Sequence, residues 1–198
     1  MTLLGSIAEI RMGATLRGRD ATRPDPNGAY RLLRIGDLSD DGRLLNSDLP
    51  RIQPHEELHD GLCLRPGDVV FANRGRRTTP YVFRLPEPNV IVGAQFFVLR
   101  PDPVRMMPEF LAWYLRSEEA AVHFANRRKG TLVAVLQRRD LAELPVPVPD
   151  LPIQRRIAEL AELADEERLI VERLAGLRRL QLNRRLIETL HPPDSSFS

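Results

Sequence analysis

The chain of 198 residues has a single cysteine, Cys63. One cysteine cannot form an internal disulfide, so a disulfide framework is excluded and a reducing compartment is favoured. No window approaches the ~18 consecutive apolar residues that a membrane-spanning helix needs. The opening "MTLLGSIAEIRMG" also lacks the basic lead, apolar run and cleavage site of a secretion signal. We therefore expect a cytoplasmic protein that does not bind a membrane.

Most signatures of enzyme active sites are missing as well. The sole lysine, Lys129, lies in "NRRKG", whereas a nuclease of the Asp…Glu-x-Lys type needs a lysine beside carboxylates on a strand. The sequence has no phosphate-binding glycine loop, no Gly-x-Ser-x-Gly motif and no cysteine–histidine cluster. We therefore predict no catalytic residue, no metal site and no cofactor.

One string does match a catalytic pattern. Residues 55–59, "HEELH", fit the His-Glu-x-x-His motif, in which two histidines one helical turn apart bind zinc and the glutamate activates water. Here Pro54 and Gly61 confine the segment to a short stretch, and no apolar scaffold surrounds it. We favour a solvated helical turn, with a zinc protease as the alternative.

Charge is nearly balanced in total, at +2, but it is unevenly distributed. Residues 71–85 hold four arginines and no acid, residues 126–140 hold five bases against Asp140, and residues 11–23 hold four arginines against Asp20. The arginine excess by itself is typical of a GC-rich genome, and a single basic cluster usually marks a solvated loop. Three clusters together predict a local positive face, which favours nucleic-acid binding.

The first 150 residues predict one mixed domain of class α+β. "RPGD", residues 65–68, has proline and glycine at the central positions of a type II turn, where the glycine needs a positive φ. Around this turn lie runs rich in β-branched and aromatic residues, which are typical of strands: 30–35, 68–72, 81–85 and 90–100.

Two helices are expected in this domain. Ser6 and Glu9 have the spacing of a capping box, which predicts a short helix ended by Gly13. Pro108 suits the first turn of a second helix, over residues 109–126. Its apolar stripe is interpreted as core, not as a platform for stacking bases; it consists of Phe110, Trp113, Tyr114, Val122 and Phe124.

The second part of the chain, residues 151–191, predicts one long coiled-coil-type helix, followed by a disordered tail over 192–198. A stiff "PVPVP" segment precedes it, Asp150 can cap it, and Pro152 suits its first turn. At 1.5 Å per residue, about 38 residues make a rod roughly 57 Å long. Its apolar residues predict pairing with a helix of another chain, and a helix folded back on its own domain is the alternative. The predicted dimerisation residues are Ile157, Leu160, Leu163, Ile170, Leu174 and Leu177.

An ordered set of motifs resembles the specificity subunits of type I restriction–modification systems. The set covers nearly the whole chain. Its last motif is the most diagnostic, since it combines a short helix, a proline-rich segment and the pattern Pro-x-x-Gln-x-x-Ile, which opens a long helix. In chain order the motifs are "LGSIAEIRMGAT", "YRLLRIGDLSDDGRL", "LRPGDVVFANRG", "VIVGAQFFVLRP", "PEFLAWYLRS" and "LQRRDLAELPVPVPDLPIQRRIAEL".

The resemblance implies a subunit without catalysis of its own. Such a subunit reads a split sequence in double-stranded DNA with two target recognition domains, which paired antiparallel helices hold apart. Methyltransferase subunits dock on those helices, and the complete enzyme adds a restriction subunit. This chain, with one recognition domain and one long helix, resembles a half-specificity subunit that pairs with a second copy or with a different half. A stand-alone dimeric DNA-binding protein and a coiled-coil adaptor without DNA binding are the alternatives.

Two loops carry the predicted DNA contacts. In the first, 73–79, arginine can bridge guanine and asparagine can bridge adenine in the major groove; its candidates are Asn73, Arg74, Arg76, Arg77 and Thr78. The second, 126–131, is expected to contact phosphates, through Arg127, Arg128 and Lys129. The next candidates are Arg17, Arg19 and Gln95.

Overall fold

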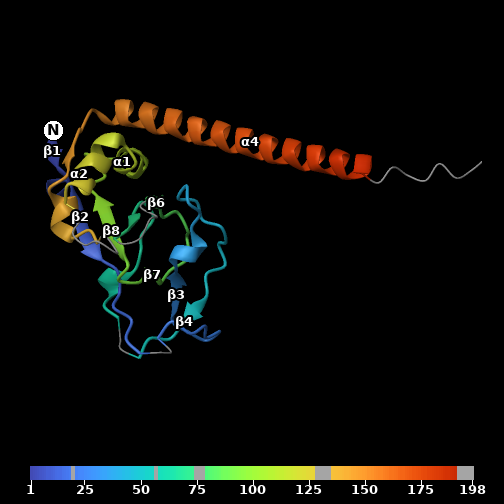
Figure 1. Cartoon of the computed structure of the whole chain (residues 1–198). Helices are drawn as coiled ribbons and strands as arrows, with labels where there is room; N and C mark the ends of the chain where they lie inside the picture. The colour runs from blue at the N-terminus through green and yellow to red at the C-terminus, as the bar shows by residue number, and fades with distance from the viewer. Residues whose placement is uncertain (19–20, 56–57, 74–78, 128–134, 191–198) are drawn as a thin grey trace, which may run out of the picture. The chain divides into compact units, whose positions relative to one another are not determined.

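The structure is a computed structural model that describes residues 1–18, 21–55, 58–73, 79–127 and 135–190 (Figure 1). It confirms the predicted class, a mixed α/β domain followed by a long helix. By internal contacts the chain divides into two compact units, Met1–Arg156 (unit 1) and Ile157–Ser198 (unit 2). The predicted tail, 192–198, lies outside the described residues.

A four-stranded antiparallel sheet forms the centre of unit 1, in the order β2-β8-β5-β6. Its strands are β2 (Ala8–Met12), β5 (Val69–Ala72), β6 (Tyr81–Val82) and β8 (Phe96–Pro101). The continuous apolar run of β5 is buried along its whole length, as expected for a strand that is covered on both faces.

A three-stranded sheet lies below the first in the view of Figure 1, in the order β4-β3-β7. In it β3 (Tyr30–Leu33) pairs antiparallel with β4 (Arg51–Ile52) and parallel with β7 (Val90–Val92). One hydrophobic core draws on both sheets, since it contains Leu33, Val70, Val92 and Val98. A third pair joins β1 (Thr2–Leu3) to β9 (Pro145–Val146).

The predicted N-terminal helix is wrong. The chain forms a short 3-10 helix, η1 (Leu4–Ser6), and then enters strand β2. The Ser6 hydroxyl donates to the Leu3 carbonyl, 2.8 Å away, and so does not act as the acceptor of a capping box. Ala8 and Ile10 are buried whereas Glu9 between them is exposed. This alternation suits a strand that pairs with β8, and the pairing overrides the local capping signal.

The helix predicted over 109–126 is two helices, α1 (Pro108–Leu115) and α2 (Glu118–Ala125). Ser117 starts the second, because its hydroxyl accepts a hydrogen bond from the backbone N–H of Ala120. Pro108 occupies the first turn of α1, as predicted. Phe110, Tyr114 and Phe124 are buried, which confirms the core interpretation for them, but Val122 is exposed.

The predicted type II turn is present and leads into a buried ion pair. Gly67 has a φ of +92°, and the Asp68 N–H donates to the Arg65 carbonyl. The Asp68 side chain is buried and accepts two hydrogen bonds of 2.8 Å from Arg100. Arg11 lies 3.8 Å from the same carboxylate, and burial lowers the pKa of its guanidinium. This cluster links β2 and β8 to the start of β5.

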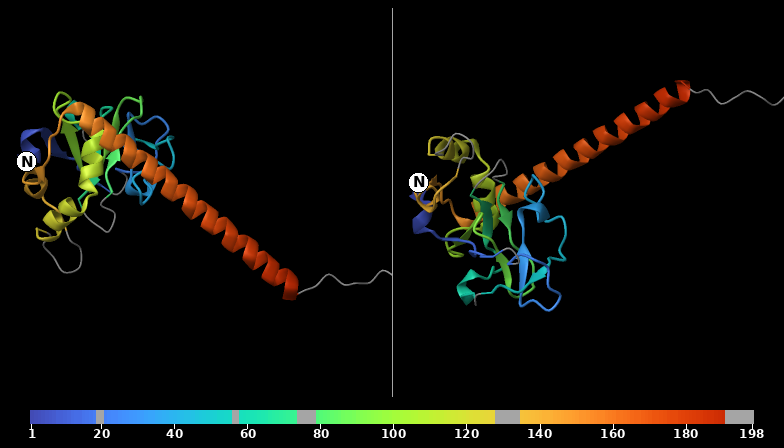
Figure 2. Two further views of the ribbon diagram at one scale, coloured as in Figure 1. Left: turned by 90° about the horizontal axis from the view of Figure 1, so that it is seen from above. Right: turned by 60° about the horizontal axis from the view of Figure 1, so that its bottom comes forward.

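The long helix α4 (Leu151–Leu190) confirms the prediction and is uninterrupted in both views of Figure 2. Its first turn belongs to unit 1 and is held there by Gln154, whose side chain is fully buried. The Gln154 Oε1 accepts from the Met107 N–H at 2.9 Å, and Nε2 donates to the carbonyls of Arg105 and Pro149 at 2.8 and 2.7 Å. Among the described residues, no helix is both long and apolar enough to cross a membrane.

Replacing Gln154 tests this anchor. Gln154→Ala would remove three hydrogen bonds made by a fully buried side chain, so we expect the free energy of unfolding of unit 1 to fall by about 3 kcal/mol. Chemical denaturation followed by tryptophan fluorescence measures this loss. Arg155→Ala, an exposed neighbour on the same turn, is the control and should change stability by less than about 0.5 kcal/mol. Equal stability of the two variants would contradict the anchoring role.

Candidate nucleic-acid interface

Several loops meet at one end of the four-stranded sheet. The antiparallel register places Met12 opposite Phe97 and Ala72 opposite Phe96. Strands β2 and β5 therefore end where β8 begins. The chain segments that leave this end are residues 13–18, the loop that starts at Asn73, and the turn between β7 and β8.

The first of these segments crosses the β7–β8 turn at close range. The Gly13 N–H donates to the Phe96 carbonyl at 3.0 Å, and the Ala14 N–H donates to the Val92 carbonyl at 2.7 Å. A Cβ atom on Gly13 would lie 2.3 Å from the Gly93 carbonyl oxygen, so only glycine fits here. Beyond this crossing the segment leads to the predicted contact Arg17, which is exposed.

Asn73, which was predicted to read a base, is bonded within the protein. Its side chain is only 4% exposed, and its Nδ2 donates to the Ala94 carbonyl at 2.7 Å. Its backbone N–H donates to the Gln95 carbonyl at 2.9 Å. Its Oδ1 is buried without a hydrogen-bond partner among the described residues. Asn73 thus holds the base of its loop through Nδ2, and its buried side chain is a weaker candidate for base reading than an exposed one.

Asn73 is also bonded to a residue that follows the second predicted loop in the chain. The carbonyl of Asn73 accepts a hydrogen bond of 2.9 Å from the N–H of Leu136. This bond joins two described residues, one in front of residues 74–78 and one after residues 128–134, at the end of the sheet. Gln95, half-buried in the β7–β8 turn, lies at this point as well. The remaining predicted contacts lie outside the described residues: Arg19, Arg74, Arg76, Arg77, Thr78, Arg128 and Lys129.

Arg127 is held by the protein itself. Its Nη1 lies 3.2 Å from His123 Nδ1, and its Nε lies 3.7 Å from a Glu143 carboxylate oxygen. The other ring nitrogen of His123 is 2.8 Å from the Asp140 carbonyl. Because a carbonyl only accepts, Nε2 carries the proton and Nδ1 accepts from Arg127. An arginine with an anionic partner of its own is a weaker candidate for phosphate contact than a solvated one.

Two exposed arginines were counted in a basic cluster but not assigned to the site. Arg138 and Arg139 open the short helix α3 (Arg138–Ala142), directly after the strand-end contact at Leu136. The side chain of Arg139 is 61% exposed and only 3.9 Å from Asp140. The helix packs against β2 and η1. In the sequence these arginines are visible only as the basic pair in "QRRD", residues 137–140. The fold adds that the residue just before this stretch, Leu136, is bonded to Asn73.

The "HEELH" segment shows no metal-site geometry in the part that the structure describes. The Nδ1 atom of His59 accepts a hydrogen bond of 2.8 Å from the Gly61 N–H. His59 stands outside any helix, just before the 3-10 helix η3 (Asp60–Leu62), so the expected helical turn is not formed by the described residues of this segment. The two glutamates lie outside the described residues. Within the described ranges, no group of three or more His, Cys, Asp and Glu side chains could hold a metal ion.

The fold is that of specificity subunits of type I restriction–modification systems. The HsdS subunit from Thermoanaerobacter tengcongensis matches with a TM-score of 0.64 and 23% identity over 90% of this chain. The S subunit from M. genitalium matches with a TM-score of 0.52 and 19% identity over 93%. A chain from a study of type I R-M complex assembly and conformational transition gives 0.69 and 21% over 92%. This chain spans only 41–42% of the length of those chains.

The sequence itself carries the family signature. Residues 2–175 match the model of the type I restriction modification DNA specificity domain. The match covers unit 1 from residue 2 onward and α4 as far as residue 175. The chain therefore belongs to this family, as the motif order predicted. A comparison with curated proteins gave no significant match.

The crossing at Gly13 offers a direct test of the interface geometry. Gly13→Ala forces a methyl group against backbone atoms of the β7–β8 turn, so we expect a loss of about 1–3 kcal/mol or more in stability. Gly36→Ala is the matched control, because a Cβ there meets no atom within 4 Å. Thermal unfolding of both variants measures the difference. A Gly13→Ala protein as stable as the control would show that the two segments do not cross as described.

Proposed function

We propose that this chain is the non-catalytic DNA-recognition component of a type I restriction–modification enzyme, and that unit 1 reads one half of a bipartite site in double-stranded DNA. The observation that supports this proposal is the hydrogen bond from the Leu136 N–H to the Asn73 carbonyl, because Asn73 begins the first basic loop and Leu136 follows the second in the chain. Membership of the family of type I restriction modification DNA specificity domains supports the proposal.

The chemistry of the loops suits both kinds of DNA contact. Arginine side chains in 74–77 can bridge O6 and N7 of guanine in the major groove. Arg128 and Lys129 are suited to phosphates, which position the protein without specifying sequence. Arg17, Arg138 and Arg139 are exposed. Arg138 and Arg139 lie beside Ala8–Ile10 of β2, and we propose that all three add positive charge to the surface that DNA meets. We propose that base reading belongs to the first loop and backbone contact to the second.

We further propose that α4 is the assembly element. Ile157, Leu160, Leu163, Ile170, Leu174 and Leu177 would face the α4 helix of a second copy or of a different half. Leu163, Ile170, Leu174 and Leu177 are between 48% and 61% exposed in the single chain, and apolar stripes of this kind mark helix pairing. Antiparallel pairing by two-fold symmetry would bury the same stripe on both chains and present two recognition domains. Methyltransferase subunits and the restriction subunit would bind to this dimer.

Two other functions predict different binding results. A stand-alone dimeric DNA-binding protein would bind DNA but would not retain a methyltransferase subunit in a pull-down. A coiled-coil adaptor would dimerise and bind no DNA. Retention of a methyltransferase subunit together with sequence-specific DNA binding separates the proposed function from both.

The proposed DNA contacts predict two different mutant phenotypes. Arg74→Ala or Arg76→Ala should cost roughly 1–3 kcal/mol on the cognate site and loosen specificity at one base position. Arg128→Ala or Lys129→Ala should weaken binding to all DNA similarly and reduce the salt slope by about one. Fluorescence titrations at several salt concentrations measure both. Arg173→Ala in unit 2 is the control. Unchanged affinity in the Arg74 and Arg76 variants would move the reading face to Arg17, Arg19 and Gln95.

The assembly proposal predicts that a charge in the seam separates the chains. Leu177→Asp would place a carboxylate in the apolar interface, so the variant should be monomeric at concentrations at which the wild type is a dimer. Leu182→Asp is a matched control off the predicted seam, since the two leucines are similarly exposed, at 51% and 57%. Light scattering at tens of micromolar measures the mass. A wild-type chain that is monomeric, with no second half that binds it, would contradict the proposal.

A further inference from the structure

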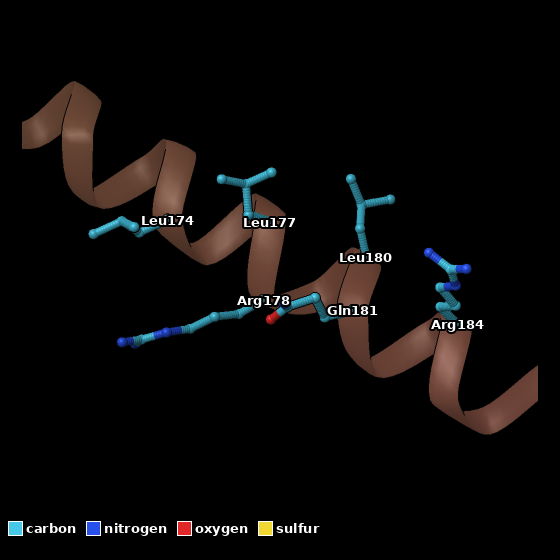
Figure 3. Close-up of a pocket in the computed structure, with 6 residues that line it drawn as sticks. All are labelled: Leu174, Leu177, Arg178, Leu180, Gln181 and Arg184. Carbon is cyan, nitrogen blue, oxygen red and sulfur yellow. The ribbon is translucent and has the colours of Figure 1, made fainter.

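The second half of α4 carries a shallow hollow between two rows of side chains (Figure 3). Leu177, Leu180 and Arg184 form one row, and Leu174, Arg178 and Gln181 extend along the other side. Such a hollow, between residues three and four positions apart, is the shape that receives a side chain of a paired helix. Leucines and arginines line the hollow, so it suits a partner helix with an apolar side chain at one seam position and an acidic side chain at the next seam position.

The seven-residue repeat of α4 identifies the residues of the seam. Two sets of positions alternate at steps of four and three residues. One set comprises Leu160, Glu167, Leu174, Gln181 and Glu188, and the other comprises Leu163, Ile170, Leu177 and Arg184. The seam thus contains acids at Glu167 and, near the end of the helix, at Glu188, and a base at Arg184. Ile170, Leu174 and Leu177 form an apolar block between Glu167 and Arg184.

Charge is also divided along the helix. Residues 157–172 contain six acids and one arginine, whereas residues 173–190 contain five arginines and one acid, Glu188. Two parallel copies would bring like charges together over their whole length. Two antiparallel copies place the acidic half of each against the basic half of the other, which favours the antiparallel arrangement.

We propose that α4 is a self-complementary seam in which a second copy of the chain pairs antiparallel in one register. In that register Leu174 lies opposite Leu177 of the second copy, Ile170 lies opposite Gln181, and Glu167 lies opposite Arg184. This inference rests on the proposed assembly through α4 and specifies its partner and its alignment.

One two-fold axis, between residues 175 and 176, generates all three pairings. In an antiparallel pair the second helix runs in the opposite direction, so its steps of three and four residues occur in reverse order. Each position of one seam set on the first helix therefore lies opposite a position of the other set on the second helix. The second copy's Ile170 then faces the hollow around Gln181, and its Glu167 reaches Arg184. In the single chain the Arg184 side chain is 83% exposed and bonded only to Glu188, at 3.0 Å, among described residues. It is therefore accessible to an acid from outside.

Another register buries more leucine but conflicts with the charges. Leu163 opposite Leu174, with Leu160 opposite Leu177, would place Glu167 of both copies beside the axis and opposite Ile170. Two carboxylates would then be desolvated close together without a cation, which is strongly unfavourable. The seam charges therefore select the register in which Glu167 meets Arg184.

A charge exchange tests the register with the 198-residue chain. Glu167→Arg or Arg184→Glu alone places like charges opposite each other twice in the dimer, so each should raise the dimer Kd about 10-fold or more. The double variant E167R/R184E should restore the wild-type Kd. An equal mixture of the two single variants should also form mixed dimers of wild-type affinity. Sedimentation equilibrium measures these constants, and circular dichroism checks that helix content is unchanged.

The control uses charges on the opposite face of the same helix. Glu172 and Arg179 lie off the seam, and Glu172 has an i,i+4 partner in Arg168, as Arg184 has in Glu188. Glu172→Arg and Arg179→Glu should each change the dimer Kd by no more than about twofold. A wild-type dimer with no rescue by the double variant or the mixture would overturn the register but leave the assembly proposal intact. A wild-type monomer would overturn both.

Discussion

Placement of β8 between β2 and β5 decides which loops of unit 1 can act together. Antiparallel pairing on both edges of β8 brings the ends of its neighbours to the point where β8 begins. The buried carboxylate of Asp68, held by Arg100 and close to Arg11, connects the same three strands from within. A slip of one residue in this register would turn each side chain to the other face. The sheet would then lose both its core and the meeting point of the loops.

Hydrogen bonds hold the segments that leave this end of the sheet. The Leu136 N–H donates to the Asn73 carbonyl, the Gly13 N–H donates to the Phe96 carbonyl where it crosses the β7–β8 turn, and the Asn73 side chain donates to the Ala94 carbonyl. These contacts hold together the described segments from which the proposed DNA-binding loops extend, and binding residues commonly lie on loops that a folded scaffold positions.

The sequence predicts elements well where the local signal and the tertiary structure agree. Pro152 and an unbroken helical pattern predict α4, and the Pro66–Gly67 pair predicts the turn with positive φ. The prediction failed for residues 6–13, because a capping-box spacing occurs within a segment that β8 recruits as a strand.

In the candidate site, clusters of arginine in the sequence identify the loops, but partners distant in the chain decide which side chains are available. The amide of Asn73 is used by Ala94, 21 residues away, and Arg127 is matched by Glu143. No local pattern contains these contacts. The sequence alone therefore could not show that Asn73 and Arg127 already have partners within the protein.

Selection of bound sequences from a random DNA pool tests whether two copies of the chain read DNA symmetrically. Each recognition unit of a symmetric dimer must read the same short sequence, and the paired helices must hold the two units at one separation. The 198-residue chain should enrich one half-site in two inverted copies at a fixed spacing of about one DNA turn, roughly 34–36 Å. Absence of enrichment, or a half-site enriched equally at all spacings, would contradict symmetric reading by two copies.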